Sequence, residues 1–217
     1  MIKAHIKGKA IAFIDYANVK SWLSRLAVTL DLKKLFELLK QQGVERICFY
    51  YGTDPQNPSS FAFFQKIRSF GYDITTKSVK YHKISLRQLL QKPINRRMLK
   101  SLDPKIRKVL LEEIEKLDRK GISLLSPKCN MDVEISLDMF LGLEDYQTFV
   151  LFSGDGDFEA ALKFLRSEGK KVIVIAKRQF LAGSLIKNCD VFLNFDKLIR
   201  SEGLTKKTRT SKIEALE

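Results

Sequence analysis

The sequence predicts an α/β protein in which a parallel sheet is flanked by helices. Continuous apolar runs of strand length, such as Ala10–Asp15 and Thr148–Phe152, are typical of strands that are buried on both faces. Between such runs, apolar residues at helical spacing end at a glycine, which indicates strands joined by crossover helices. With 217 residues and 45% hydrophobic content, the chain can bury one core and still carry an insertion.

The first predicted strand, residues 10–15, ends at an acidic residue, Asp15. Asp31 is then expected to cap a helix, because apolar residues at helical spacing follow it and Gly43 provides a stop. Residues 44–51 (VERICFYY) are rich in apolar and aromatic residues, so we predict the second strand there.

A further helix and strand follow the second strand. Ser59 or Ser60 is expected to cap this helix, Gly71 to end it, and residues 72–79 to form the third strand. The same succession of helix, glycine and strand returns at residues 158–176. This alternation is what predicts the parallel sheet.

A strongly basic segment interrupts the pattern between residues 77 and 108. Eleven Lys or Arg residues there accompany a single acid, Asp103. Apolar residues are interleaved with the cations, so we predict a basic insertion of amphipathic helices at about residues 80–120.

The predicted organisation is one domain over residues 1–202, which contains the insertion, followed by a flexible polar tail over residues 203–217. No apolar run approaches the roughly 18 residues of a membrane-spanning helix, and the amino terminus lacks a signal-peptide core. We therefore expect a cytoplasmic protein with no membrane partner. Cys48, Cys129 and Cys189 have no CxxC spacing, which predicts reduced side chains.

The net charge points to a polyanionic partner. Thirty-nine Lys and Arg residues against 25 Asp and Glu residues give a formal charge of +14, which attracts nucleic acid. A homodimer is a second partner that the composition leaves open.

Four acidic residues stand at the boundaries of predicted elements. Asp15 ends the first strand, Asp132 begins a predicted helix, and Asp155 and Asp157 follow the strand at Thr148–Phe152. Neighbouring strands lie about 4.8 Å apart, so carboxylates at adjacent strand ends can reach one cation if these two strands are neighbours. Mg²⁺ or Mn²⁺ suits such oxygen ligands, and the chemistry it supports is hydrolysis of a phosphodiester.

Each acid also has a purely structural explanation. Asp155 and Asp157 fit a helix cap and a turn residue, and Asp132 fits a cap as well as a ligand. Asp15 directly follows an apolar run, where a buried and unpaired charge is costly, and this favours a site.

Two other polar residues accompany these acids. Asn18 fits either a cap of the following turn or a side chain that orients water or phosphate. Asp138 follows Asp132 by six residues, about 240° around an ideal helix, so the two acids cannot share one face.

Three motifs in this order resemble the NYN domain family of the PIN-like nuclease superfamily, in particular its bacterial LabA-like branch. The motifs are Phe13-Ile14-Asp15-Tyr16-Ala17-Asn18-Val19, then Met131-Asp132-Val133 followed by Asp138, then Ser153-Gly154-Asp155-Gly156-Asp157-Phe158. The likeness covers about residues 10 to 200. Family members often carry Gly-Val-Asp-Val before the helix; this chain has Cys129-Asn130-Met131-Asp132-Val133, which retains the acid.

The resemblance implies a Rossmann-like (PIN-like) parallel sheet with an acidic pocket for Mg²⁺ or Mn²⁺, and several members are endoribonucleases. Carried over to this chain, it implies metal-pocket acids at Asp15, Asp132 and Asp155, a polar companion at Asn18 and an outer acid at Asp157. These five residues are the candidate catalytic residues, and the first three are the candidate metal ligands.

The basic insertion offers a means of holding RNA beside an acidic pocket that would otherwise repel it. Tyr16 or Tyr81 is a candidate for stacking on an unpaired base. A solvated helix face is the alternative explanation of the charge. The candidate RNA-binding residues are Lys80, Lys83, Arg87, Arg96, Arg97 and Lys100.

The leading hypothesis is a metal-dependent ribonuclease that hydrolyses RNA phosphodiester bonds. The first alternative is a noncatalytic RNA-binding or regulatory module that retains the acidic pocket. A phosphatase of the haloacid dehalogenase type has a similar glycine and aspartate turn, but its motif needs a second aspartate where this chain has Ala17. DNA is an alternative substrate, whereas the family likeness favours RNA.

Overall fold

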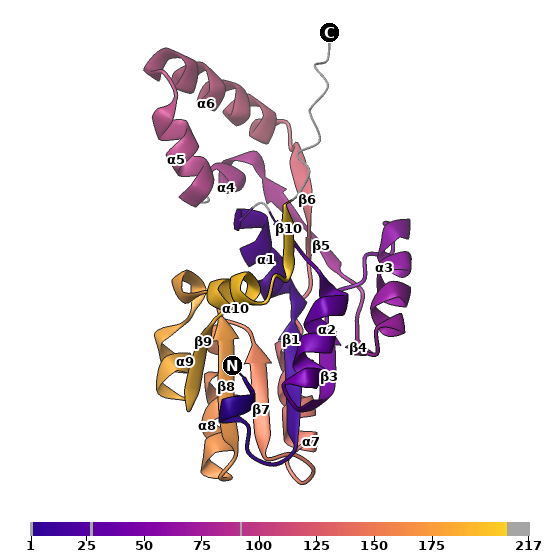
Figure 1. Cartoon of the computed structure of the whole chain (residues 1–217). Coiled ribbons are helices and arrows are strands. Elements are labelled where there is room, and N and C mark those ends of the chain that lie inside the picture. The colour runs from indigo at the N-terminus through magenta and orange to yellow at the C-terminus, as the bar shows by residue number, and fades with distance from the viewer. Residues whose placement is uncertain (1, 27, 92, 208–217) are drawn as a thin grey trace. The chain divides into compact units, whose positions relative to one another are not determined.

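A six-stranded parallel sheet forms the centre of the protein, as a computed structural model describes it over residues 2–26, 28–91 and 93–207 (Figure 1). The strand order is β4-β3-β1-β7-β8-β9. The strands are β1 (Ala10–Asp15), β3 (Val44–Tyr50), β4 (Asp73–Thr75), β7 (Thr148–Phe152), β8 (Lys171–Ala176) and β9 (Val191–Asn194). The sequence prediction of an α/β fold with a parallel sheet is therefore confirmed.

Helices connect the strands and flank the sheet. They are α1 (Tyr16–Leu26), α2 (Leu32–Gln41), α3 (Pro58–Ser69), α7 (Asp132–Leu141), α8 (Glu159–Ser167), α9 (Gly183–Lys187) and α10 (Phe195–Ser201). Three short 3-10 helices add η1 (Lys3–His5), η2 (Gly156–Phe158) and η3 (Arg178–Phe180). All three cysteines are free, as predicted.

The core lies along β1 and β7, whose residues are all buried. At its centre the ring of Phe13 stacks on Phe149, with centroids 6.1 Å apart and the planes 3° from parallel. On its other side Phe13 stacks on Tyr50 at 6.4 Å. Three neighbouring strands are thus held together by one row of aromatic rings.

Two details of the connections differ from the sequence prediction. Asp31 caps α2 as expected, because its side chain accepts a hydrogen bond from the backbone of Lys34. The cap of α3, however, is Asn57 and not Ser59 or Ser60. Proline has no N–H to lose at the first helical position, so Pro58 starts the helix and the cap moves to the residue before it.

Residues 79–129 form a second compact unit, separate from the unit of residues 1–78 and 130–217. In its described residues, 79–91 and 93–129, two antiparallel strands pair and three helices lie between them in the chain. The elements are β5 (Lys80–Ser85), α4 (Leu86–Gln91), α5 (Pro93–Ser101), α6 (Pro104–Arg119) and β6 (Ser123–Lys128).

The insertion, predicted as amphipathic helices at about residues 80–120, contains helices but begins with a strand. Lys80 and Lys83 lie on β5, where they pair with Lys128 and Leu125 of β6. A local apolar period does not reveal a strand whose partner lies more than forty residues later in the chain. The side chain of Asp118 ties α6 to the start of α4, directly after β5, by accepting hydrogen bonds from the backbone of Leu86 and Arg87.

The predicted polar tail begins with an ordered segment. Thr205–Lys207 form β10, which pairs antiparallel with β2 (Val28–Leu30). Leu204 explains this order, because its side chain is buried and its carbonyl oxygen accepts a hydrogen bond from the backbone of Asp31. Residues 208–217 lie outside the described part of the chain.

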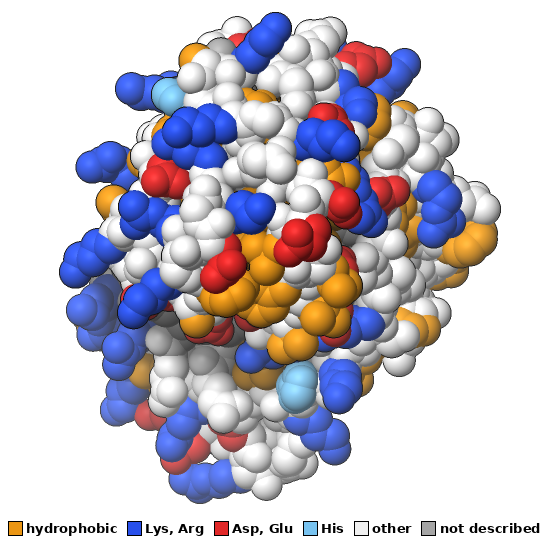
Figure 2. All heavy atoms as spheres, turned by 90° about the horizontal axis from the view of Figure 1, so that it is seen from below, with side chains coloured by type: hydrophobic (Ala, Val, Ile, Leu, Met, Phe, Trp, Pro, Cys, Tyr) orange, Lys and Arg blue, Asp and Glu red, His pale blue; other side chains and the backbone are white. Residues whose placement is uncertain are grey.

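Some apolar side chains remain exposed on the surface. In α7 and α8 they include Val133, Leu137, Leu141 and Phe164. Figure 2 shows hydrophobic side chains gathered together on the face that it draws, with acidic and basic side chains around them. Among the described residues, no helix has the length and apolar character that crossing a membrane requires.

The aromatic row gives a direct test of the core. Replacing Phe13 with alanine removes a fully buried ring and leaves a cavity, so we expect Phe13→Ala to lower the free energy of unfolding by about 3–5 kcal/mol. Phe61→Ala is the control, because this side chain is 69% exposed and should change the value by no more than about 0.5 kcal/mol. Urea unfolding measures both, and similar losses in the two variants would contradict this description of the core.

Candidate metal centre

The pairing of β1 with β7 brings two strand ends to the same edge of the sheet. The strands run parallel, and Ile14 pairs with Phe152 in the last position of the register. Asp15 and Ser153 therefore leave the sheet side by side. This is the neighbour relation that the sequence prediction required, and ligands bind at this edge in open parallel sheets.

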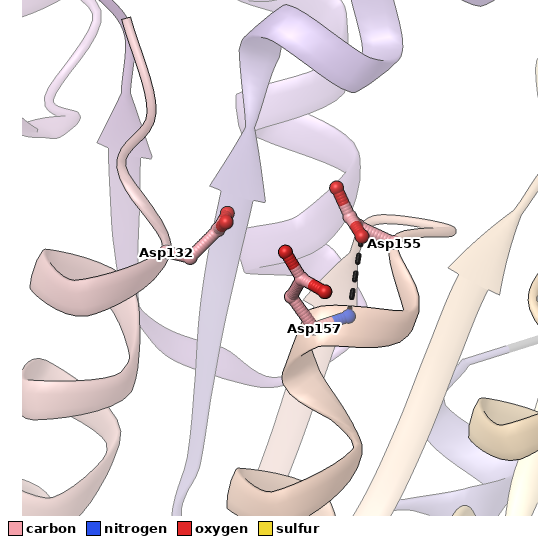
Figure 3. Close-up of side chains that lie close together, drawn as sticks. All are labelled: Asp132, Asp155 and Asp157. Carbon is pink, nitrogen blue, oxygen red and sulfur yellow. Dashed lines mark hydrogen bonds between the residues drawn. The ribbon is translucent and has the colours of Figure 1, made fainter.

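Three carboxylates converge beside this edge. Each of Asp132, Asp155 and Asp157 offers an oxygen that lies within 4.8 Å of the others. Figure 3 shows the three side chains turned toward a common space. Asp132 is the first residue of α7, Asp155 precedes η2, and Asp157 belongs to η2.

Asp15 is buried next to these acids and is held by hydrogen bonds. Asn18 donates to its carboxylate from the backbone N–H at 3.2 Å and from Nδ2 at 2.6 Å. Ser153 Oγ donates to Asp15 Oδ2 at 3.0 Å and accepts from the backbone N–H of Asp155 at 3.2 Å. One hydrogen-bonded chain thus links Asn18, Asp15, Ser153 and Asp155.

The structure groups the predicted acids differently from the expected ligand set. Asp157, expected as an outer acid, is one of the three clustered carboxylates. Asp15 is coupled to Asp132 and Asp155 through charge, while its oxygens accept hydrogen bonds from Asn18 and Ser153. Asn18 therefore orients Asp15, a role that the sequence alone did not indicate.

The structural explanations of the acids can be judged from their contacts. Asp132 is not a cap: the cap residue of α7 is Met131, and the backbone N–H of Asp132 donates to Asn130 Oδ1 at 2.7 Å. Its carboxylate is thus not used for capping. Asp155 does cap η2, since its Oδ1 accepts from the backbone N–H of Asp157 at 3.2 Å.

The electrostatics of the cluster favour a bound cation. Burial raises the pKa of Asp15, an effect that hydrogen bonds from Asn18 and Ser153 oppose and the charge of Asp155 reinforces. Burial also raises the pKa of Asp132, and the charges of Asp155, Asp15 and Asp157 add to this effect. A hard divalent cation relieves such repulsion, and all the donors here are oxygens, which Mg²⁺ and Mn²⁺ prefer. The residues therefore fit the metal that the sequence predicts.

Two side chains that sequence reasoning did not place in the site anchor α7. Tyr50 Oη donates to Asp138 Oδ2 at 2.6 Å, so the side chain of Asp138 is engaged with the end of β3. Lys77 Nζ forms an ion pair with Glu134 at 2.7 Å. The position of Tyr50 at the end of a predicted strand could have placed it near the site, but its hydrogen bond to Asp138 could not be predicted from the sequence.

Gly154 is required by a close approach of the backbone. A Cβ at this position would overlap the carbonyl oxygen of Phe180. The carbonyl of Gly154 also accepts a hydrogen bond from the backbone of Ala182 at 3.0 Å. The resulting pocket of about 410 Å³ is lined by Asn18, Gly154, Asp155, Gly156, Phe180, Leu181 and Ala182.

The predicted RNA-binding residues belong to the second unit. Lys80 and Lys83 are exposed on β5, Arg87 on α4, and Arg96 and Lys100 on α5. Arg87 forms an ion pair with Glu115 at 3.4 Å. The side chain of Arg97 lies outside the described part of the structure. Contact between these residues and RNA stays a prediction.

Comparisons with known proteins identify relatives of the chain. The model of the NYN domain family matches residues 9–198. The Low amplitude and bright protein LabA of Synechococcus elongatus is 34% identical over 98 residues, which are 45% of this chain and 52% of that protein, so the chain spans about half the length of this relative.

A solved structure supports the fold. A crystal structure of a protein of unknown function from Vibrio parahaemolyticus superposes with a TM-score of 0.58 at 21% identity. The match covers 88% of this chain and 94% of the other. At this identity the likeness establishes the fold alone.

Metal binding should stabilise the folded protein. We expect Mn²⁺ or Mg²⁺ to raise the Tm of the wild type, by the equivalent of about 2.7 kcal/mol at a hundredfold excess over Kd. Asp132→Asn and Asp155→Asn should lose most of this rise because each removes a clustered carboxylate. Asp145→Asn, an exposed acid in the turn after α7, is the control. Equal rises in all four proteins would show that the cation binds elsewhere.

The same stabilisation should depend on pH in a defined direction. The pKa of Asp132 is raised above the ordinary 3.8, so protons compete with the cation at a higher pH than at an isolated aspartate. The metal-induced rise in Tm should therefore shrink as the pH falls toward 3.8, the ordinary pKa of an aspartate. A rise that persists unchanged below that pH would contradict carboxylate ligation.

Proposed function

Because the chain belongs to the NYN domain family, we propose that it is a metal-dependent ribonuclease that hydrolyses RNA phosphodiester bonds. The observation that carries the proposal is the convergence of three carboxylates within 4.8 Å at the carboxyl edge of the sheet. Capping and burial explain single acids in such a place. They do not explain three acids that face one another beside a fourth buried one.

Each residue of the site has a proposed task. Asp132, Asp155 and Asp157 would hold Mg²⁺ or Mn²⁺. A bound divalent cation of this kind activates water as a nucleophile and stabilises the charge that develops on a phosphodiester. Asp15 adds a fourth negative charge, and Asn18 keeps its carboxylate in one orientation.

The charge of the chain supports RNA as the substrate class. An acidic cluster repels a polyanion, whereas the net charge of +14 attracts one from a distance. The described basic residues of the second unit, from Lys80 on β5 to Lys100 on α5, would neutralise phosphates without reading sequence.

Cleavage of RNA tests the proposal. Purified wild type should cleave a labelled RNA in Mn²⁺ or Mg²⁺ and lose this activity in EDTA. Asp155→Asn and Asp15→Asn should both fall to the EDTA level, with Asp145→Asn retaining wild-type activity. Wild-type cleavage by a folded Asp155→Asn would overturn the proposal, and salt-sensitive RNA binding with no turnover in the wild type would instead favour a noncatalytic module.

Ser153 offers a test of the hydrogen-bonded chain. Ser153→Ala removes the bond to Asp15 and the acceptor for the Asp155 N–H, so each acid loses one of the contacts that orient it. Residues that orient metal ligands usually contribute about 10–100-fold to activity, and we expect a decrease of that size in kcat with KM little changed. The control is Ser167→Ala on the exposed end of α8. Wild-type kcat in Ser153→Ala would contradict this positioning role.

A further inference from the structure

A second hollow lies in the sheet-containing unit, next to the candidate metal centre. It is a groove of about 760 Å³ lined by parts of α1, β2, α2 and α3. This volume is within the range of about 300–1,000 Å³ that ligand sites occupy. The NYN resemblance assigns no role to it, and the acids of the site do not line it.

The first helix links this groove to the metal centre. Tyr16 and Lys20, one helical turn apart, line the groove, while Asn18 between them lines the pocket beside Asp155. Residues four apart share a helix face and a residue two positions on points elsewhere, so α1 serves both hollows. Tyr16 directly follows Asp15 in the chain, so one residue of the groove lining is the immediate neighbour of the buried acid of the site.

The groove has an aromatic surface. Tyr16, Phe63 and Phe70 line it and are each half-buried. The rings of Tyr16 and Phe63 are stacked, with centroids 5.6 Å apart and the planes 25° from parallel. Half-buried rings that are fixed by each other provide a rigid platform on which a flat heterocycle can stack.

The charge of the groove is positive. Among the described residues that line it, the lysines Lys20, Lys33, Lys66 and Lys206 stand against one acid, Asp31. Asp31 is already engaged as the cap of α2 and in an ion pair with Lys206 at 3.7 Å. The groove therefore suits a ligand that carries both flat rings and several negative charges.

We propose that this groove binds the unpaired nucleotides of an RNA strand on one side of the cleavage point. The bases stack on Tyr16, Phe63 and Phe70, and the phosphates lie against Lys20 and Lys66. Single-stranded RNA presents both groups at once, whereas a duplex keeps its bases stacked inside. This assignment rests on the proposed function for the identity of the polyanion, and it makes single-stranded RNA the preferred substrate.

Helix α3 provides matched variants for a test. Phe63 and Lys66 line the groove, whereas Phe61 and Arg68 on the same helix are exposed and lie outside its lining. Each variant is made in the Asp155→Asn protein and studied in EDTA, so binding is measured without cleavage. The probes are a fluorescent single-stranded oligouridylate, an abasic oligonucleotide of the same length and an RNA duplex, and the readout is fluorescence anisotropy.

The proposal predicts a specific pattern of affinities. Phe63→Ala should weaken binding of the oligouridylate about 5- to 150-fold, the range that loss of one stacked base produces, and leave the abasic probe unaffected. Lys66→Gln should weaken both single-stranded probes and lower the salt dependence by about 0.7 of a log unit per decade, the value for one phosphate contact. Phe61→Ala and Arg68→Gln should bind all three probes as the parent does.

Several outcomes would contradict the proposal that the groove binds RNA. Equal affinity of Phe63→Ala and Phe61→Ala for oligouridylate would do so, as would equal losses in Lys66→Gln and Arg68→Gln. Since Lys66 is exposed, its replacement tests the groove even if Phe63→Ala fails to fold. Tighter binding of the duplex than of the oligouridylate would also contradict the proposal.

The outcome is separable from that of the proposed function. If RNA cleavage is absent in the wild type but the predicted affinity pattern holds, the groove binds RNA as proposed and the ribonuclease proposal is wrong. If cleavage occurs and the matched variants bind RNA with equal affinity, the ribonuclease proposal is supported and the proposal that the groove binds RNA is wrong.

Discussion

The parallel pairing of β1 with β7 is the constraint on which the site depends. Both strands are buried along their whole length, so their backbone groups must pair with each other and the register cannot slip without exposing the core. The stack of Phe13 on Phe149 fixes the same pair from the side. With this pairing set, Asp15 and Ser153 leave the sheet together and the turn to Asp155 follows.

The negative charges of the clustered acids repel one another, and contacts with surrounding residues hold these acids together. Burial and the charges of neighbouring acids raise the pKa of Asp15 and of Asp132, and a free chain would let the acids separate. Asn18 and Ser153 hold Asp15 from two elements, and the bond from Tyr50 to Asp138 holds the helix that carries Asp132. Rigid support of this kind lets the protein present converging carboxylates to a cation instead of relaxing away from it.

Much of the fold and of the site could be predicted from local patterns in the sequence. Apolar runs that end at Asp15 and at Phe152 predicted both strand ends, because burial on two faces leaves a continuous signal in the sequence. Features that depend on distant parts of the chain were not predictable in this way. They include the pairing of β5 with β6, the bond from Tyr50 to Asp138, and the groove, whose walls come from α1, α2 and α3. Asp157 joins the cluster through the tight geometry of η2, which residue spacing alone does not specify.

The central claim is that the clustered carboxylates hold a divalent cation. Anomalous scattering from crystals of the protein soaked in Mn²⁺ tests it most directly, because the ion is located independently of any activity. A strong peak is expected between the carboxylates of Asp132, Asp155 and Asp157. A fully occupied ion bound elsewhere, with these three side chains turned away from one another, would contradict it.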